Sequence, residues 1–77
     1  MRYKLKFHAR QRMAQRGITD DDIVSALMDI IMQYPAEPGS VCILGNVGSR
    51  KLAIYVSGVM PPTEPLAITT VVWRDET

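Results

Sequence analysis

One histidine and two arginines recur at every fourth position near the N-terminus of the chain. If this segment is helical, His8, Arg12 and Arg16 form one stripe, because residues four apart on a helix drift by only about 40° and lie about 6 Å apart. Neighbouring guanidinium groups disfavour a second positive charge, which leaves a neutral imidazole able to act as a general base. Arginines in the same stripe can hold a phosphodiester and stabilise the charge that builds at phosphorus. The stripe predicts the catalytic half of a metal-free ribonuclease site.

The rest of such a site must come from the strands. Lysines and arginines would add phosphate contacts, and a tryptophan ring would let an RNA base stack. The predicted phosphate- or RNA-binding residues are Lys4, Lys6, Lys51, Trp73 and Arg74, with Arg50 and Tyr55 as further candidates. Structural alternatives stay open, since a lone histidine at a helix start is often a capping or partly buried residue. A strand tyrosine or tryptophan is often part of the core.

Charge is distributed unevenly along the chain, although the formal net charge is only +1. Six lysines and arginines precede the first acidic residue, Asp20. Residues 1–19 therefore carry +6 and residues 20–77 carry −5. A local positive field of this kind attracts phosphates or an acidic protein. A merely solvated basic face is the alternative interpretation.

The N-terminal third predicts a strand and a short helix. Residues 2–7, RYKLKF, alternate basic with apolar side chains, which is typical of a strand with one buried face. Helical periodicity begins at about His8 and continues to Arg16. Gly17 then supplies the residue type that most often ends a helix.

A second helix is predicted from about Asp20 to Gln33. Thr19 can cap it, the aspartates at positions 20–22 complement the positive end of its dipole, and Pro35 lies beyond its expected end. Apolar residues cover well over half of its circumference, so it should be largely buried. Because this helix is acidic and contains no lysine or arginine, a DNA-binding helix-turn-helix is disfavoured.

Three β-branched, apolar segments follow and predict antiparallel strands joined by hairpins. They are VCILGN (41–46), KLAIYVSGV (51–59) and LAITTVVWR (66–74), with the proline-rich MPPTEP (60–65) as a loop. The expected element order is β-α-α-β-β-β. This order predicts a two-layer α+β fold, in which an antiparallel sheet packs on a helical hairpin, as a single domain of residues 1–77.

Composition argues against several other classes of protein. One cysteine and one histidine are too few for a structural zinc site, and three consecutive aspartates on a helix point 100° apart, so we expect no metal and no cofactor. The chain has neither the apolar stretch of a signal peptide nor the roughly 18 apolar residues of a membrane span. A cytoplasmic protein with no membrane partner is the expectation.

Residues 8–27, HARQRMAQRGITDDDIVSAL, resemble the signature of a group of small bacterial domains of unknown function. In that signature His-Ala-x-x-Arg-Met-x-x-Arg-Gly-Ile precedes an acidic stretch and an apolar helix. The matching positions are His8, Ala9, Arg12, Met13, Arg16, Gly17 and Ile18. The predicted element order is also similar to that of RelE- and BrnT-like toxins, which are small ribonucleases that cleave messenger RNA without metal.

This resemblance implies a toxin-like endoribonuclease that uses His8, Arg12 and Arg16 and is neutralised by a cognate antitoxin. The alternative is a non-catalytic binding module, for instance a phage or mobile-element accessory protein. Its basic N-terminal face would dock RNA or an acidic protein. Self-association to a homodimer is compatible with either function, because a chain this short buries only a small core.

Overall fold

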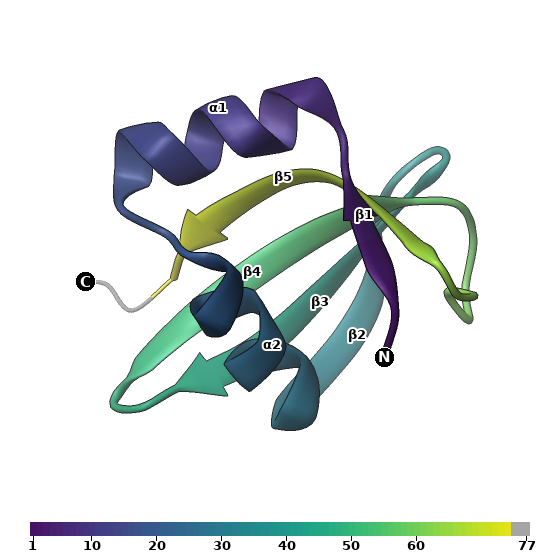
Figure 1. Ribbon diagram of the computed structural model, residues 1–77. Helices are drawn as coiled ribbons and strands as arrows, with labels where there is room; N and C mark the ends of the chain where they lie inside the picture. The colour runs from purple at the N-terminus through teal and green to yellow at the C-terminus, as the bar shows by residue number, and fades with distance from the viewer. Residues whose placement is uncertain (75–77) are drawn as a thin grey trace.

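Two helices lie against one face of a five-stranded sheet in the computed structural model, which describes residues 1–74 (Figure 1). The order of strands across the sheet is β1-β5-β4-β3-β2. Helix α1 packs over β5, whereas α2 packs over β3 and β4. The elements in chain order are β1 (Tyr3–Leu5), α1 (Phe7–Arg16), α2 (Asp20–Met28), β2 (Ile30–Glu37), β3 (Ser40–Val47), β4 (Arg50–Ser57) and β5 (Leu66–Trp73).

Both helices are bounded by the local signals that the sequence contains. Helix α1 ends at Gly17, whose φ of 65° is the left-handed conformation that glycine adopts without steric cost. At the start of α2 the Thr19 hydroxyl accepts the backbone N–H of Asp22, and the Asp22 carboxylate accepts the backbone N–H of Thr19. This reciprocal capping box fixes the direction in which α2 leaves the loop.

The hydrophobic core lies between the helices and the sheet. Alternate residues of the three central strands point toward the helices, and side chains of both helices meet them. Apart from a few partly buried neighbours, the core consists of Ala9, Met13, Ile18, Ile23, Ala26, Leu27, Val41, Ile43, Leu52, Ile54, Val56, Leu66, Ile68 and Val71.

The expected order β-α-α-β-β-β is wrong, because the structure has an additional strand and the order β-α-α-β-β-β-β. The second helix ends at Met28 rather than Gln33, and Ile30–Glu37 forms the strand β2. At Asp29 the backbone leaves the helical region, with φ −142° and ψ 64°. The Asp29 carbonyl then accepts the backbone N–H of Asn46 on β3, which directs the following residues along β3.

Pro35, which was expected to lie beyond the end of the second helix, is part of strand β2 and does not interrupt it. Pro35 pairs with Val41 inside β2, which lies at one of the two edges of the sheet. A proline is tolerated on an edge strand because such a strand has only one neighbouring strand. The missing N–H of the proline then removes no hydrogen bond to a strand on the other side. A register shift between Pro35 and Glu37 ends the regular pairing of β2 with β3.

The sheet is mixed, whereas an antiparallel sheet was expected. Strands β2 to β5 pair antiparallel, but β1 pairs parallel with β5, with Tyr3 opposite Leu66. Without β1, the outer edge of β5 would expose its unpaired backbone groups. The backbone N–H of Lys6 donates to the Ile68 carbonyl at 2.9 Å, which extends the pairing to the start of α1.

Gly45 sets the distance between α2 and β3. A Cβ atom at this position would lie 2.1 Å from the carbonyl oxygen of Ala26. Because the opposing atoms belong to the backbone of α2, no side-chain rotation could make room for it. The absence of a side chain at Gly45 lets the helix approach the sheet closely.

Candidate nucleic-acid interface

The three residues of the predicted catalytic stripe lie on α1, on the helical side of the sheet, but have different surroundings. His8 is exposed, and its ring makes an edge-on contact with Phe7 at a centroid distance of 5.8 Å. Within residues 1–74 the imidazole has no hydrogen bond. Arg12 is half-buried and donates to the amide oxygen of Gln15 at 3.1 Å.

Arg16 fastens α1 to β5. Its Nη1 donates to the Val71 carbonyl at 2.7 Å, and the Arg16 carbonyl accepts the indole N–H of Trp73 at 3.1 Å. The guanidinium of Arg50 lies over the Trp73 ring, 3.8 Å from its centroid. Arg16 and Trp73 therefore have structural roles, and one face of the ring proposed for base stacking is already covered.

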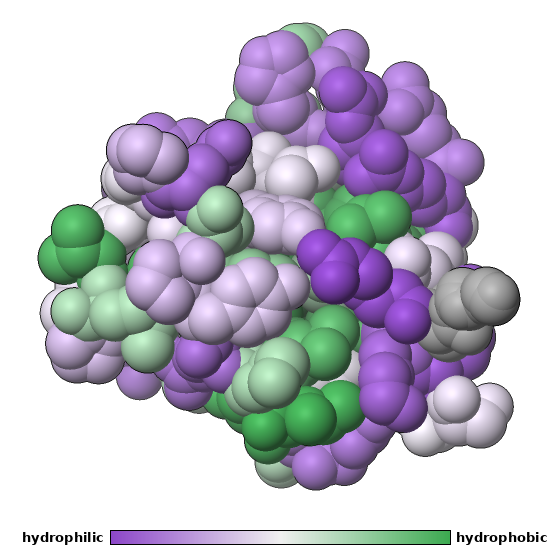
Figure 2. Space-filling model, turned by 180° about the vertical axis from the view of Figure 1, so that it is seen from behind, coloured by the Kyte–Doolittle hydropathy of each residue, from purple (hydrophilic) through white to green (hydrophobic). Residues whose placement is uncertain are grey.

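The open face is our name for the side of the sheet that carries no helix within residues 1–74. Figure 2 shows it from behind, with a pale, moderately hydrophilic centre between strongly hydrophilic residues and an apolar cluster. The side chains that alternate with the core residues project here. Cys42 and Ala53 are fully buried on this face although no helix covers them. The side chains around them must therefore form a packed layer.

Arg74 and two tyrosines form the polar centre of the open face. Nη2 of Arg74 donates to the Tyr55 hydroxyl, and the guanidinium carbon lies 6.0 Å from the centroid of the Tyr55 ring. The hydroxyls of Tyr55 and Tyr34 raise the pKa of Arg74, so its charge is permanent. Arg74 is exposed, and Tyr55 occupies only one of the five N–H donors of a guanidinium.

Tyr34 extends this cluster to the edge strand. Contact with the Cys42 thiol is the largest cause that raises the pKa of Tyr34, burial adds to it, and the Arg74 charge opposes it. The phenol therefore stays protonated near neutral pH and remains a hydrogen-bond donor.

Two of the predicted phosphate-binding lysines also project toward the open face. Lys51 alternates with the buried Leu52, and its carbonyl accepts the backbone N–H of Arg74 at 2.8 Å. Lys4 alternates with Tyr3 and Leu5, which pack against the core. Because Lys4 pairs with Ala67, it lies about 20 Å along β5 from Arg74.

The remaining basic candidate, Lys6, is the exposed N-cap residue that precedes α1. The structure does not bring the predicted residues together in one site. Lys4, Lys51 and Arg74 belong to the open face, whereas the stripe of α1 and Trp73 belong to the helical layer. Within residues 1–74, no three histidine, cysteine, aspartate or glutamate side chains gather as a metal site would require.

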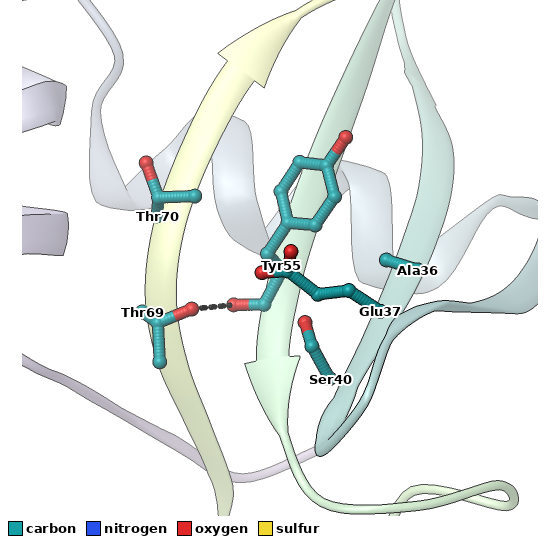
Figure 3. Close-up of a pocket in the computed structure, with 6 residues that line it drawn as sticks. All are labelled: Ala36, Glu37, Ser40, Tyr55, Thr69 and Thr70. Carbon is teal, nitrogen blue, oxygen red and sulfur yellow. Dashed lines mark hydrogen bonds between the residues drawn. The ribbon is translucent and has the colours of Figure 1, made fainter.

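A hollow of about 390 Å³ lies on the open face beside Tyr55 (Figure 3). Figure 3 shows the Glu37 side chain reaching from β2 across the sheet toward the base of Tyr55. The Thr69 hydroxyl donates to the Tyr55 carbonyl at 3.2 Å. The lining residues are Ala36, Glu37, Ser40, Tyr55, Thr69 and Thr70.

Sequence reasoning did not identify Tyr34 or Glu37 as site residues. Both lie on β2, whose first residues were predicted to end the second helix and whose later residues were assigned to no element. Ile30, Ile31 and Tyr34 are residue types that favour strands, but the apolar Ile31 interrupts any alternation of apolar and polar residues, so the sequence does not show the period of a strand.

The architecture and surface define a small mixed α+β domain with helices on one face of the sheet and an exposed polar face on the other. The chain belongs to the family described as a domain of unknown function (DUF4258), whose model matches residues 5–73. Neither the curated proteins nor the solved structures compared with the chain gave a match. No helix among residues 1–74 is long and apolar enough to cross a membrane.

Proposed function

We propose that the domain binds single-stranded RNA across the open face of its sheet. The observation that carries the proposal is the exposed guanidinium of Arg74, which is held in place by the Tyr55 hydroxyl beside Lys51. An arginine fork matches the geometry of a phosphate, and its prior fixation reduces the entropy lost on binding.

Single strands fit this face better than a duplex does. A sheet whose open face carries half-buried tyrosines can receive bases that are not stacked in a helix, as in other sheet-based RNA-binding modules. Helix α2, the obvious element to enter a DNA groove, begins with three aspartates and contains no basic residue. Lys4 of β1, which pairs with Ala67 near the far end of β5, supplies a second cation for an RNA strand that runs along the sheet.

The test is the affinity of short, fluorescently labelled single-stranded RNA, measured by anisotropy for the wild type, Arg74→Gln and Arg10→Gln. Both variants remove one exposed positive charge, but Arg10 lies on α1. Loss of a charge-assisted phosphate contact should weaken the Arg74 variant about tenfold. The Arg10 variant should bind nearly as tightly as the wild type. Equal affinities of the two variants would refute the proposal.

Cleavage of the bound RNA is a second candidate function, favoured by the protonated phenol of Tyr34 beside Arg74. In such a step the 2′-hydroxyl of the RNA attacks phosphorus and loses its proton to solvent, and the bond from phosphorus to the 5′-oxygen breaks. A phenol can give its proton to the departing 5′-oxygen while a guanidinium balances the charge on phosphorus. This assignment moves the toxin-like activity from α1 to the open face. In EDTA, Tyr34→Phe should then slow cleavage, whereas His8→Ala should not. The opposite result would return the catalytic role to His8.

The toxin-like form of this proposal includes a cytoplasmic location, which suits the free, buried thiol of Cys42. It also includes an acidic antitoxin that competes with RNA for the cations of the open face. Such a competitor should lose affinity for Arg74→Gln in parallel with RNA.

A further inference from the structure

The hollow beside Tyr55 is lined by a carboxylate, that of Glu37, which has no partner in the described part of the chain. Glu37 lines the hollow, and its carboxylate has no hydrogen bond or ion pair within residues 1–74. A carboxylate accepts hydrogen bonds and donates none when ionised. The best ligand for it presents two N–H groups side by side.

Only one of the four RNA bases has this arrangement on its Watson–Crick edge. Guanine carries N1–H next to the N2 amino group. In adenine and cytosine the amino group lies next to a ring nitrogen that accepts hydrogen bonds and would repel a carboxylate. Uracil has a single N–H between two carbonyl oxygens. A carboxylate therefore distinguishes guanine from the other three bases, because it accepts hydrogen bonds from both guanine donors. Any of the other bases would place a hydrogen-bond acceptor against the carboxylate.

The other walls of the hollow suit a planar base. Tyr55 contributes an aromatic side chain, and Ser40 and Thr70 contribute hydroxyls that either donate or accept. The volume of about 390 Å³ falls within the range of small-molecule sites. Tyr55 also holds Arg74, whose guanidinium carbon is 6.0 Å from the Tyr55 ring centroid. One side chain thus joins the hollow to the proposed phosphate contact.

We propose that the hollow binds a guanine base of the RNA, with the Glu37 carboxylate accepting its N1–H and N2–H groups. This inference rests on the proposed RNA-binding function and adds base selectivity to it. Glu37 contributes little to affinity for other sequences, because its negative charge repels phosphate. Its effect is to favour strands that place a guanine beside the phosphate held by Arg74.

The experiment compares three short RNAs that differ at one central position within a uridine strand: guanosine, inosine or uridine. Inosine keeps N1–H but lacks the N2 amino group. The wild type should bind the guanosine strand about tenfold more tightly than the uridine strand, with inosine between them. Glu37→Gln should bind all three strands within about twofold of one another.

The matched control is Asp21→Asn, which also removes one exposed negative charge but lies on α2, on the helical side. It should keep the guanosine preference, and the thermal midpoint of Glu37→Gln should equal that of the wild type because Glu37 is exposed. If the wild type does not prefer guanosine, or if Glu37→Gln keeps the preference, the guanine site is refuted while RNA binding stands. If no strand binds, RNA binding itself fails.

Discussion

Arginines that look equivalent in the sequence use their guanidinium groups differently. The Arg16 guanidinium donates a hydrogen bond to the Val71 carbonyl and thereby joins α1 to β5. Arg74 is held by a tyrosine hydroxyl yet stays exposed, with donors left for a ligand. Spacing along a helix correctly places Arg16 on a stripe with His8, but it does not show which groups lie under the helix. That information depends on β5, which is 55 residues away in the chain.

Tyr3 gives a prediction at the scale of one residue. Its hydroxyl donates to Asp20 at 2.8 Å, and burial, followed by this hydrogen bond and the Asp20 charge, raises the pKa of Tyr3 from 10.0 to about 12. A raised pKa means that the folded state holds the proton more tightly. The corresponding stability is complete below pH 10 and is lost as the pH rises toward 12.

Urea unfolding at pH 8, 10 and 11.5 would measure this loss for the wild type and Tyr3→Phe. The variant has no phenol to ionise, so its stability should fall less steeply above pH 10. Tyr34 also has a raised pKa, and its ionisation will lower the free energy of unfolding of both proteins alike at high pH. Parallel curves for the two proteins would show that Tyr3 does not couple folding to pH.

At the scale of elements, the capping residues Gly17 and Thr19 were easier to predict from local chemistry than the strand partners or the end of α2 at Met28. The cap at Thr19 and the stop at Gly17 are encoded within a few residues and occur as predicted. Strand β2 was missed because its apolar residues continue the pattern of α2 and because Pro35 resembles a loop residue. Its strand conformation depends on β3, a partner that hydropathy alone does not reveal. The missing strand also concealed Tyr34 and Glu37.

The contact between α2 and β3 predicts a large effect of Gly45→Ala. The added methyl group would meet the carbonyl oxygen, carbonyl carbon and Cα of Ala26, all within 3 Å. Moving the helix should cost about 3 kcal/mol, the upper part of the range for overpacked cores. Ala26→Gly should not restore the stability, because the opposing atoms are backbone.

Gly39→Ala is the comparison for this measurement by urea unfolding. Gly39 has a φ of 78° and open space around it, so a methyl group there adds only backbone strain of about 1 kcal/mol. A Gly45 variant no less stable than the Gly39 variant would mean that α2 can move away from the sheet without cost.

At the scale of the whole molecule, the two layers divide the positive charge. The cations of α1 lie on the helical side, whereas Lys51 and Arg74 lie on the open face. A cation on α1 and a cation on the open face contribute equally to the net charge and to the long-range field. These two quantities therefore cannot identify the face that binds RNA. Direct phosphate contacts can, because each contact releases counterions and adds to the salt dependence of binding.

Two double variants with equal net charge therefore separate the faces. Lys51→Gln with Arg74→Gln removes two of the open-face cations and leaves Lys4, and Arg10→Gln with Arg12→Gln removes two cations of α1. For single-stranded RNA each lost phosphate contact lowers the slope of log affinity against log salt by about 0.7, so the open-face pair should lower it by about 1.4. The α1 pair should leave the slope unchanged. If the α1 pair produces the larger drop, RNA binds on the helical side, and the stripe of α1 becomes the interface.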